Sequence, residues 1–133
     1  MNRPTDLAFY MIVENGMSNG YIIQTVYTAS EFTCPTFKRI RRDGVWGPWN
    51  SMDIVANDDL NAKTVIGTHI CNSSSVASSV IHAPGSGPFV MDIRQGMSVG
   101  YIVQTVYYFA NASIPIYMRV RISGTWSAWV KIN

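Results

Sequence analysis

Carboxylate side chains are the first place to look for catalysis in this sequence, because cleavage of a glycosidic bond needs two acids that converge on it. The eight acidic residues are scattered along the chain: Asp6, Glu14, Glu31, Asp43, Asp53, Asp58, Asp59 and Asp92. Only Asp58 and Asp59 adjoin, and neighbours in sequence need not face each other. A helix N-cap is the better interpretation of that pair. The acidic residues therefore predict no catalytic dyad.

Histidine, cysteine and serine show no catalytic or metal-binding pattern either. His69 and His82 lie thirteen residues apart with Cys71 between them, whereas a metal site needs three or four convergent ligands. No Gly-x-Ser-x-Gly nucleophile motif and no glycine-rich phosphate loop occurs. Cys34 and Cys71 are predicted to be buried free thiols, since two cysteines do not make a disulfide framework. We expect no enzyme activity, no metal and no cofactor.

The densest basic stretch is Lys38-Arg39-Ile40-Arg41-Arg42, whose charge alone would suit phosphate groups. On a strand, however, successive side chains alternate between two faces, so these charges are divided, and Asp43 follows them. The whole chain carries a formal charge of only +2. Because nucleic-acid binding requires a basic stripe or patch, the sequence predicts no nucleic-acid partner.

Aromatic residues offer a second binding chemistry. Four tryptophans stand in two pairs, Trp46 with Trp49 and Trp126 with Trp129. Positions i and i+3 of a strand point to opposite faces, so one indole of each pair is expected to pack inward and the other to face outward. An outward indole beside tyrosine and arginine suits either a sugar ring or a subunit interface. The candidate contacts, with both alternatives open, are Trp46, Trp49, Tyr107, Tyr108, Arg121, Trp126 and Trp129.

The elements that must position these residues are repeated within the chain. A shift of 80 residues aligns positions 4–52 with 84–132 without a gap, and 19 of the 49 aligned positions are identical. Unrelated segments of average composition share about one position in fifteen. Under this shift, the partners of most of residues 51–83 would precede residue 1. We therefore expect a truncated first repeat at residues 1–52 and a complete second repeat at residues 53–133.

Each repeat is predicted to consist mainly of antiparallel strands. Tyr21–Tyr27 and its counterpart Tyr101–Tyr107 are rich in β-branched and aromatic residues on both faces, which is typical of a central strand. Phe89–Ile93 is expected to precede the second of these as a strand. Ile116–Ile122 alternates two sets of side chains, as a strand with two different faces does.

Turn and helix signals complete this all-β interpretation. The tight turn Ser123-Gly124-Thr125 is expected to lead into 126–131 as a hairpin. Asn57–Lys63 is the best helical signal and predicts at most one short turn. The polar segment Ser73–Ser79 is predicted to be a loop.

Two polar residues of the repeat are predicted to form structural pairs. Gln104 lies in the apolar central strand, where a buried amide without a partner costs about 1–3 kcal/mol. Arg119 offers five donors, and it lies fifteen residues later, at the distance expected for an adjacent antiparallel strand. Gln24 and Arg39 recur at the same offset in the first repeat. A shared scaffold explains this recurrence better than one receptor site does.

Composition limits what the repeats can form. The chain has 133 residues, and the 47% that are apolar exclude intrinsic disorder. Only 14% are charged, against about 25% in average globular domains, so other subunits are expected to cover part of the surface. Gln24 and Gln104 interrupt the two most apolar stretches, so we expect no membrane insertion. The N-terminus lacks the pattern of a secretory signal.

Several of these residues occur in an order that resembles a known family. The order is Asp59-Leu60-Asn61, Gly67, Pro84, Gln104, Tyr117-x-Arg119 and Gly124-x-Trp126-Ser127-x-Trp129-x-x-Ile132. It resembles the knob repeat of R-type pyocin and bacteriophage tail fibres, as a whole unit over residues 59–133 and as a partial one over residues 4–52. The first repeat departs from the pattern, because Lys38 and Arg42 replace apolar residues and the Asp-Leu-Asn opening is missing.

The resemblance implies a β-rich module of a trimeric, receptor-binding fibre in a phage or phage-like particle. The implied location is the virion tail fibre, assembled in the host cytoplasm, and the implied partners are two further copies, other tail or fibre proteins and a bacterial surface glycan. The leading hypothesis is a non-enzymatic module that contacts bacterial surface polysaccharide or supports the part that does. The alternative is a carbohydrate-binding accessory domain of a larger polysaccharide-degrading tailspike or cell-wall enzyme.

Overall fold

The computed structural model describes residues 4–15, 20–28, 35–98, 100–109 and 114–133. The chain divides into two compact units, unit 1 at Met1–Asp53 and unit 2 at Ile54–Asn133. Each unit contains one antiparallel sheet, and one short helical turn is the only helix in the part of the chain that the structure describes. The predicted all-β, mainly antiparallel fold class is confirmed.

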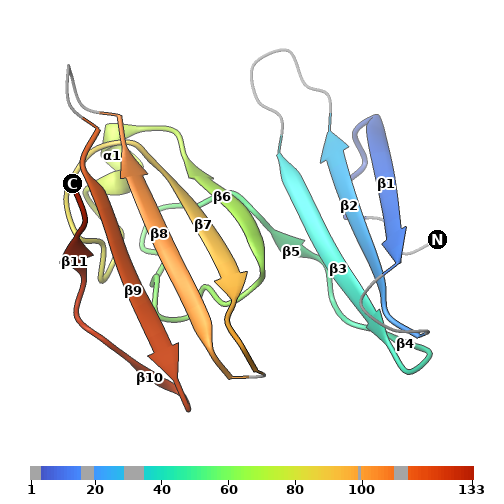
Figure 1. Ribbon diagram of the computed structural model, residues 1–133. Coiled ribbons are helices and arrows are strands. Elements are labelled where there is room, and N and C mark those ends of the chain that lie inside the picture. Colours follow the sequence, from blue (N-terminus) through green and yellow to red (C-terminus); the bar gives the residue numbers. More distant parts are fainter. Residues whose placement is uncertain (1–3, 16–19, 29–34, 99, 110–113) are drawn as a thin grey trace. The chain divides into compact units, whose positions relative to one another are not determined.

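Each of the two sheets contains three long strands in equivalent positions (Figure 1). Unit 1 has the strand order β1-β2-β3-β4, with β5 also paired to β3, and its strands are β1 (Phe9–Asn15), β2 (Ile22–Thr28), β3 (Thr36–Arg42), β4 (Val45–Trp46) and β5 (Asn50–Ser51). Unit 2 has the order β10-β9-β8-β7-β6, with β11 also paired to β9, and its elements are β6 (Gly67–Cys71), α1 (Ser74–Ala77), β7 (Phe89–Gln95), β8 (Ile102–Tyr108), β9 (Ile116–Ile122), β10 (Thr125–Trp126) and β11 (Val130–Lys131). Under the shift of 80 residues, β1, β2 and β3 correspond to β7, β8 and β9.

The central strands are those that the sequence predicts, because β2 and β8 each pair on both sides. Gln104, Val106 and Tyr108 of β8 are buried on one face, and the alternate side chains on the other face are half-buried. The register places Ile93 and Arg119 on either side of Gln104. One face of the three long strands therefore carries both the core and the predicted Gln104–Arg119 pair.

In each unit a tight turn joins the third long strand to the short strand that follows it and so forms a hairpin. Asp43 and Gly44 connect β3 to β4 with φ of 50° and 84°, and Ser123 and Gly124 connect β9 to β10 with φ of 49° and 89°. Positive φ at both central residues is the pattern of a type I′ turn, whose twist matches that of the strands it joins. Glycine at the second position tolerates this conformation at no steric cost.

The short helix of the structure lies in a different segment from the one that the sequence predicts. Asn57–Lys63 forms turns rather than a helix. The helix α1 lies instead in the serine-rich segment predicted as loop, and the Ser73 hydroxyl caps it by accepting a hydrogen bond from Val76 N. A single capped turn is too short to show the 3.6-residue periodicity from which helices are predicted.

The core of unit 2 lies between one face of its sheet and the segment 54–83, which we call the covering segment. The sheet contributes Phe89, Met91, Ile93, Val106 and Tyr108, and the covering segment contributes Ile54, Leu60, Cys71 and Ala77. The Tyr108 ring packs against Phe89 and Tyr117, with ring centroids 5.4 and 5.9 Å apart. The covering segment thus closes the face on which Gln104 and Arg119 lie.

Candidate binding cleft

Gln104 is the centre of a buried polar cluster in unit 2. Its side chain is fully buried, and its Oε1 accepts a hydrogen bond from Arg119 Nε at 2.8 Å. Its Nε2 donates to two backbone carbonyls of the covering segment, that of Leu60 at 2.8 Å and that of Lys63 at 2.7 Å. The amide therefore has partners at both ends, as a buried amide needs. It ties β8 and β9 to the covering segment.

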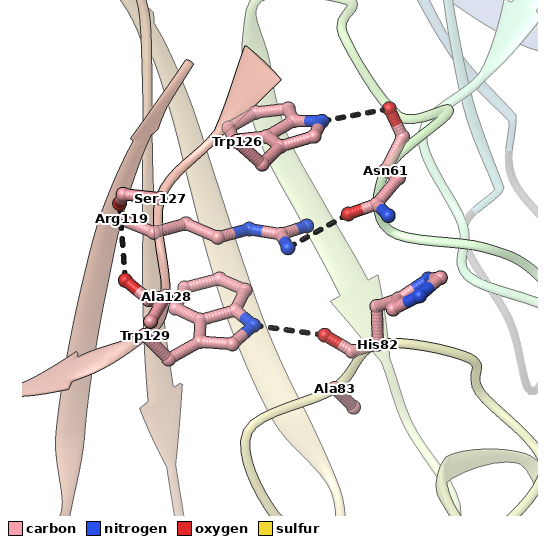
Figure 2. A pocket seen from close by; sticks show the side chains of 8 residues that line it. All are labelled: Asn61, His82, Ala83, Arg119, Trp126, Ser127, Ala128 and Trp129. Atoms are coloured by element: carbon pink, nitrogen blue, oxygen red, sulfur yellow. Dashed lines mark hydrogen bonds between the residues drawn. The ribbon is translucent and has the colours of Figure 1, made fainter.

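The Arg119 guanidinium is enclosed on both of its faces. Its central carbon lies 4.3 Å from the ring centroids of Trp126 and of Trp129, and Nη1 donates to Asn61 Oδ1 at 2.7 Å (Figure 2). Aromatic faces and a side-chain oxygen thus replace water around the planar cation. Burial lowers the pKa of Arg119 to about 10, an effect that the Asp59 carboxylate opposes. The side chain remains a cation at neutral pH.

Both indoles of this pair pack on the same guanidinium. Trp126 Nε1 donates to the Asn61 carbonyl at 3.1 Å, and Trp129 Nε1 donates to the His82 carbonyl at 2.8 Å. The prediction that the two indoles would face opposite ways is wrong. The rule for positions i and i+3 holds within one strand, whereas here the chain leaves β10 and re-enters the sheet only at β11.

Asp59 joins the two parts of the covering segment that accept these indole hydrogen bonds. Its Oδ1 accepts a hydrogen bond from Asn61 N at 2.8 Å and lies 2.7 Å from His82 Nδ1. These contacts, the hydrogen bond with His82 first among them, lower the pKa of the Asp59 carboxyl. The predicted helix N-cap is wrong, because the segment forms turns and the carboxylate bonds within them.

A cleft of about 380 Å³ opens beside this cluster. Figure 2 shows the residues that line it, namely Asn61, His82, Ala83, Arg119, Trp126, Ser127, Ala128 and Trp129. Two half-buried indoles supply its apolar walls, and Asn61 and His82 supply polar groups. Ligand sites combine apolar or aromatic walls with a few polar groups that fix orientation. The arrangement therefore suits non-covalent binding.

Unit 1 repeats the guanidinium sandwich. The Arg39 central carbon lies 4.4 Å from the Trp46 ring centroid and 4.3 Å from that of Trp49, and Arg39 Nε donates to Gln24 Oε1 at 2.8 Å. Burial lowers the pKa of Arg39 from its ordinary value. Gln24 and Arg39 are nevertheless only half-buried, whereas their counterparts in unit 2 are buried. Both units thus have the glutamine–arginine contact that the sequence predicts; its structural role stays a prediction.

The remaining candidate contacts lie outside the cleft. Tyr108 is buried in the core, where its hydroxyl donates to Gly85 O at 2.8 Å and accepts from Gly85 N at 2.9 Å, and burial raises its pKa to about 12. The expectation of a surface contact is therefore wrong for Tyr108, because the alternation of β8 turns it inward. Tyr107 points to the other face of the sheet. The Arg121 central carbon lies 5.9 Å from the Trp126 ring centroid.

The residues considered for metal binding and catalysis have other partners. His69 is buried with Nε2 2.8 Å from Val65 O, and Cys71 is a buried free thiol whose pKa burial raises. Asp58 pairs with Lys63 at 2.7 Å. Among the described residues, no three His, Cys, Asp or Glu side chains form a group that could hold a metal ion. Cys34 and Glu31 lie outside the described residues.

Sequence reasoning missed the residues that complete the cleft from the covering segment. Asn61 contributes its side-chain oxygen and its backbone carbonyl, and only the Asp-Leu-Asn motif of the family resemblance marked it. His82 was considered as a metal ligand, but it contributes a backbone carbonyl to Trp129. A carbonyl has no signal in the sequence, because every residue carries one.

Comparison with known proteins gives a structural match. No protein-family model matches the chain, and no curated protein matches its sequence. A C-terminal part of the R2 pyocin fibre of P. aeruginosa is similar in structure, with a TM-score of 0.54 and 18% identity over 99% of this chain and 40% of that chain. A C-terminal part of the R1 pyocin fibre matches with a TM-score of 0.54 and 17% identity over 99% of this chain and 39% of that chain.

These matches confirm, at the level of the fold, the resemblance to pyocin fibres that the sequence motifs predict. The chain spans about 40% of the length of the fibre structures it matches. No helix in the described part of the chain is long and apolar enough to cross a membrane.

Proposed function

We propose that the chain is a non-enzymatic structural module of a tail fibre in a phage or phage-like particle, and that its cleft contacts bacterial surface polysaccharide. The observation that carries the proposal is the fold, since the match to two pyocin fibres extends over 99% of the chain. The knob-like order of motifs, from Asp59-Leu60-Asn61 to the two tryptophans Trp126 and Trp129, supports the same assignment.

The composition of the cleft supports a sugar as its ligand. Trp126 and Trp129 keep part of each indole exposed, and an indole surface suits the apolar face of a sugar ring. Asn61 and the half-exposed His82 side chain supply hydrogen-bonding groups for hydroxyls. The volume of about 380 Å³ lies within the range of roughly 300–1,000 Å³ that is typical of small-ligand sites.

The walls of the cleft are fixed before any ligand binds. Each indole N–H is hydrogen-bonded to the covering segment, and Arg119 is bonded at Nε and at Nη1. A preorganised site loses little conformational entropy on binding. The same bonds hold unit 2 together, so a substitution of Trp126 or Trp129 tests stability and binding at once. A sharper test must change the rim and leave the cluster intact.

Ala128 offers this test, because it is exposed on the rim and its side chain makes no hydrogen bond. We expect Ala128→Arg to fill the cleft and to reduce binding at least tenfold on an array of bacterial surface polysaccharides. Thr125→Arg is the matched control, since it adds the same side chain at an exposed position of the same hairpin outside the cleft. Both variants should melt at the wild-type temperature. Equal binding by all three proteins would refute the assignment of the cleft.

We further infer that three copies of the chain assemble through the outer faces of their sheets. In unit 2, Ile70, Met118 and Ile122 are exposed on the face opposite the core. Apolar faces of this kind mark interaction surfaces, and closed symmetry buries them. The low share of charged residues, 14%, supports the same inference.

A further inference from the structure

Arg119 is a buried cation without an ion-pair partner. It exposes 5% of its surface, and none of the acidic residues that the structure describes lies within salt-bridge distance of it. The Asp59 carboxylate acts on the guanidinium, but its Oδ1 accepts from Asn61 N and lies 2.7 Å from His82 Nδ1. Buried charges are normally paired, because the protein interior solvates them poorly. An anion is therefore the group that this cluster lacks.

Two N–H groups beside the cleft have no acceptor. Arg119 Nη2 is buried and makes no hydrogen bond within the described part of the chain, whereas Nε and Nη1 each donate one. Asn61 uses its side-chain oxygen to accept from Nη1, so its Nδ2 remains as a further donor. Figure 2 shows these two side chains meeting at the wall of the cleft. An anionic oxygen group complements such a pair of donors.

The oxygens around these donors already accept hydrogen bonds. The Asn61 carbonyl accepts from Trp126, and the His82 carbonyl accepts from Trp129. Ser127 Oγ accepts from the backbone as well. No acidic side chain stands among the described residues that line the cleft. The capacity that the cleft has left is therefore mainly that of hydrogen-bond donors, together with one positive charge.

We propose that the cleft selects acidic saccharides, and that an anionic substituent of the sugar accepts a hydrogen bond from Asn61 Nδ2 and supplies the counter-charge of Arg119. This inference rests on the proposed function, because it names the class of polysaccharide that the cleft takes. The anion is a carboxylate or a phosphate, since both present oxygens that accept from these donors. A neutral sugar makes the same contacts with the indoles but leaves the cation uncompensated.

The surroundings of Arg119 strengthen its attraction for an anion. Indoles at 4.3 Å cover both faces of the guanidinium and keep water from it, and Nη2 is buried. Its charge therefore acts on the cleft through protein rather than through bulk water, where it would be weaker. Arg121 lies on the same face of β9, 5.9 Å from the Trp126 ring centroid, and it forms no ion pair with any described residue. Positive charge is thus in excess beside the cleft.

The test uses an array on which every acidic polysaccharide stands beside its own neutralised form. Carboxylates are reduced to primary alcohols in one set of pairs, and phosphates are removed in the other. We expect the full chain to bind acidic members about tenfold more tightly than their neutral forms, because a hydrogen bond to a charged group is worth about that factor or more. The set in which binding falls identifies the anion. Equal binding of acidic and neutral forms would overturn this inference alone, whereas binding to no member would refute the proposed function as well.

Asn61→Asp supplies the missing anion from the protein itself. The variant keeps the side-chain oxygen that accepts from Arg119 and the carbonyl that accepts from Trp126, but it loses the free donor. We expect it to melt at or above the wild-type temperature, because the new carboxylate pairs with the buried cation, and to lose the preference for acidic forms. A lower melting temperature would contradict the missing ion pair, and a retained preference would contradict the site.

Thr125→Asp is the matched control for the overall charge of the chain. It lowers the net charge by the same amount as Asn61→Asp, at an exposed position outside the cleft. We expect this variant to keep the preference for acidic polysaccharides. An equal loss of preference in both variants would show that net charge selects the ligand, and it would overturn the proposal.

Discussion

Replacement of Gln104 by leucine is expected to destabilise unit 2 far more than the same replacement of Gln24 destabilises unit 1. Gln104 makes three hydrogen bonds and is fully buried, whereas Gln24 makes one and is half-buried. The two residues occupy the same position in equivalent strands. The pair therefore compares one substitution in a closed and in an open copy of the same site.

The magnitude follows from the partners that Gln104→Leu leaves behind. The hydrogen bond from the Arg119 cation is worth about 1.5–3 kcal/mol, and each bond to a buried carbonyl about 1 kcal/mol. The loss is therefore about 4 kcal/mol, against a stability of about 4–12 kcal/mol for a unit of about 80 residues. It corresponds to a fall in melting temperature of roughly 15 °C or more. Gln24→Leu loses one bond in a site that water reaches, or about 1–2 kcal/mol.

Hydrogen exchange in moderate urea separates the two units, because peptides from β8 and from β2 report on them individually. We expect Gln104→Leu to speed exchange throughout β7, β8 and β9, and polysaccharide binding to be lost only as unit 2 unfolds. If Gln104→Leu keeps full stability yet loses binding, Gln104 belongs to the recognition surface and the reasoning is wrong. An effect no larger than that of Gln24→Leu would also contradict it.

Three further outcomes are expected. Because the pKa of Asp59 is lowered, its contribution to stability is complete above the unfolded value of 3.8 and is lost as the pH falls through the lower folded value. His82→Ala removes the main cause of the lowered pKa, so urea titrations of this variant should show a smaller loss of stability that is complete at a higher pH. Tyr108→Phe removes two hydrogen bonds to Gly85 and should cost about 1–3 kcal/mol at pH 7. Because the folded pKa of Tyr108 is about 12 and the unfolded one is 10.0, the stability advantage of wild type over this variant should shrink by up to about 3 kcal/mol between pH 10 and 12; an unchanged difference would contradict the burial of the phenol. Light scattering at micromolar concentration should give a mass near three times 14.8 kDa, and a monomer mass would refute the inferred trimer.

The long strands were predictable because their signals are local. Alternation in β9, apolar residues on both faces of β8 and a Ser-Gly turn each follow from a few neighbouring residues. The contact between Gln104 and Arg119 was predictable for a related reason. Two adjacent antiparallel strands place fixed pairs opposite each other, and a buried amide in an apolar strand needs a donor across the ladder.

The cleft was not predictable, because it depends on contacts between distant segments. The carbonyls of Leu60, Lys63 and His82 complete the cluster, and nothing in a sequence marks one carbonyl among many. The two indoles enclose Arg119 because the chain leaves the sheet between β10 and β11, which breaks the alternation on which their predicted directions rested. Asp59 was likewise predicted to cap a helix, but its carboxylate accepts a hydrogen bond from Asn61 N within a turn.

The most direct test of the proposed function is a titration of the full chain with bacterial surface polysaccharide, followed through its tryptophan indole N–H signals by nuclear magnetic resonance. The chain has four tryptophans, so each unit contributes two of these signals. We expect the signals of Trp126 and Trp129 to shift saturably, and those of Trp46 and Trp49 to stay in place. Absence of any shift, or equal shifts of all four signals, would contradict the assignment of the cleft as a polysaccharide contact.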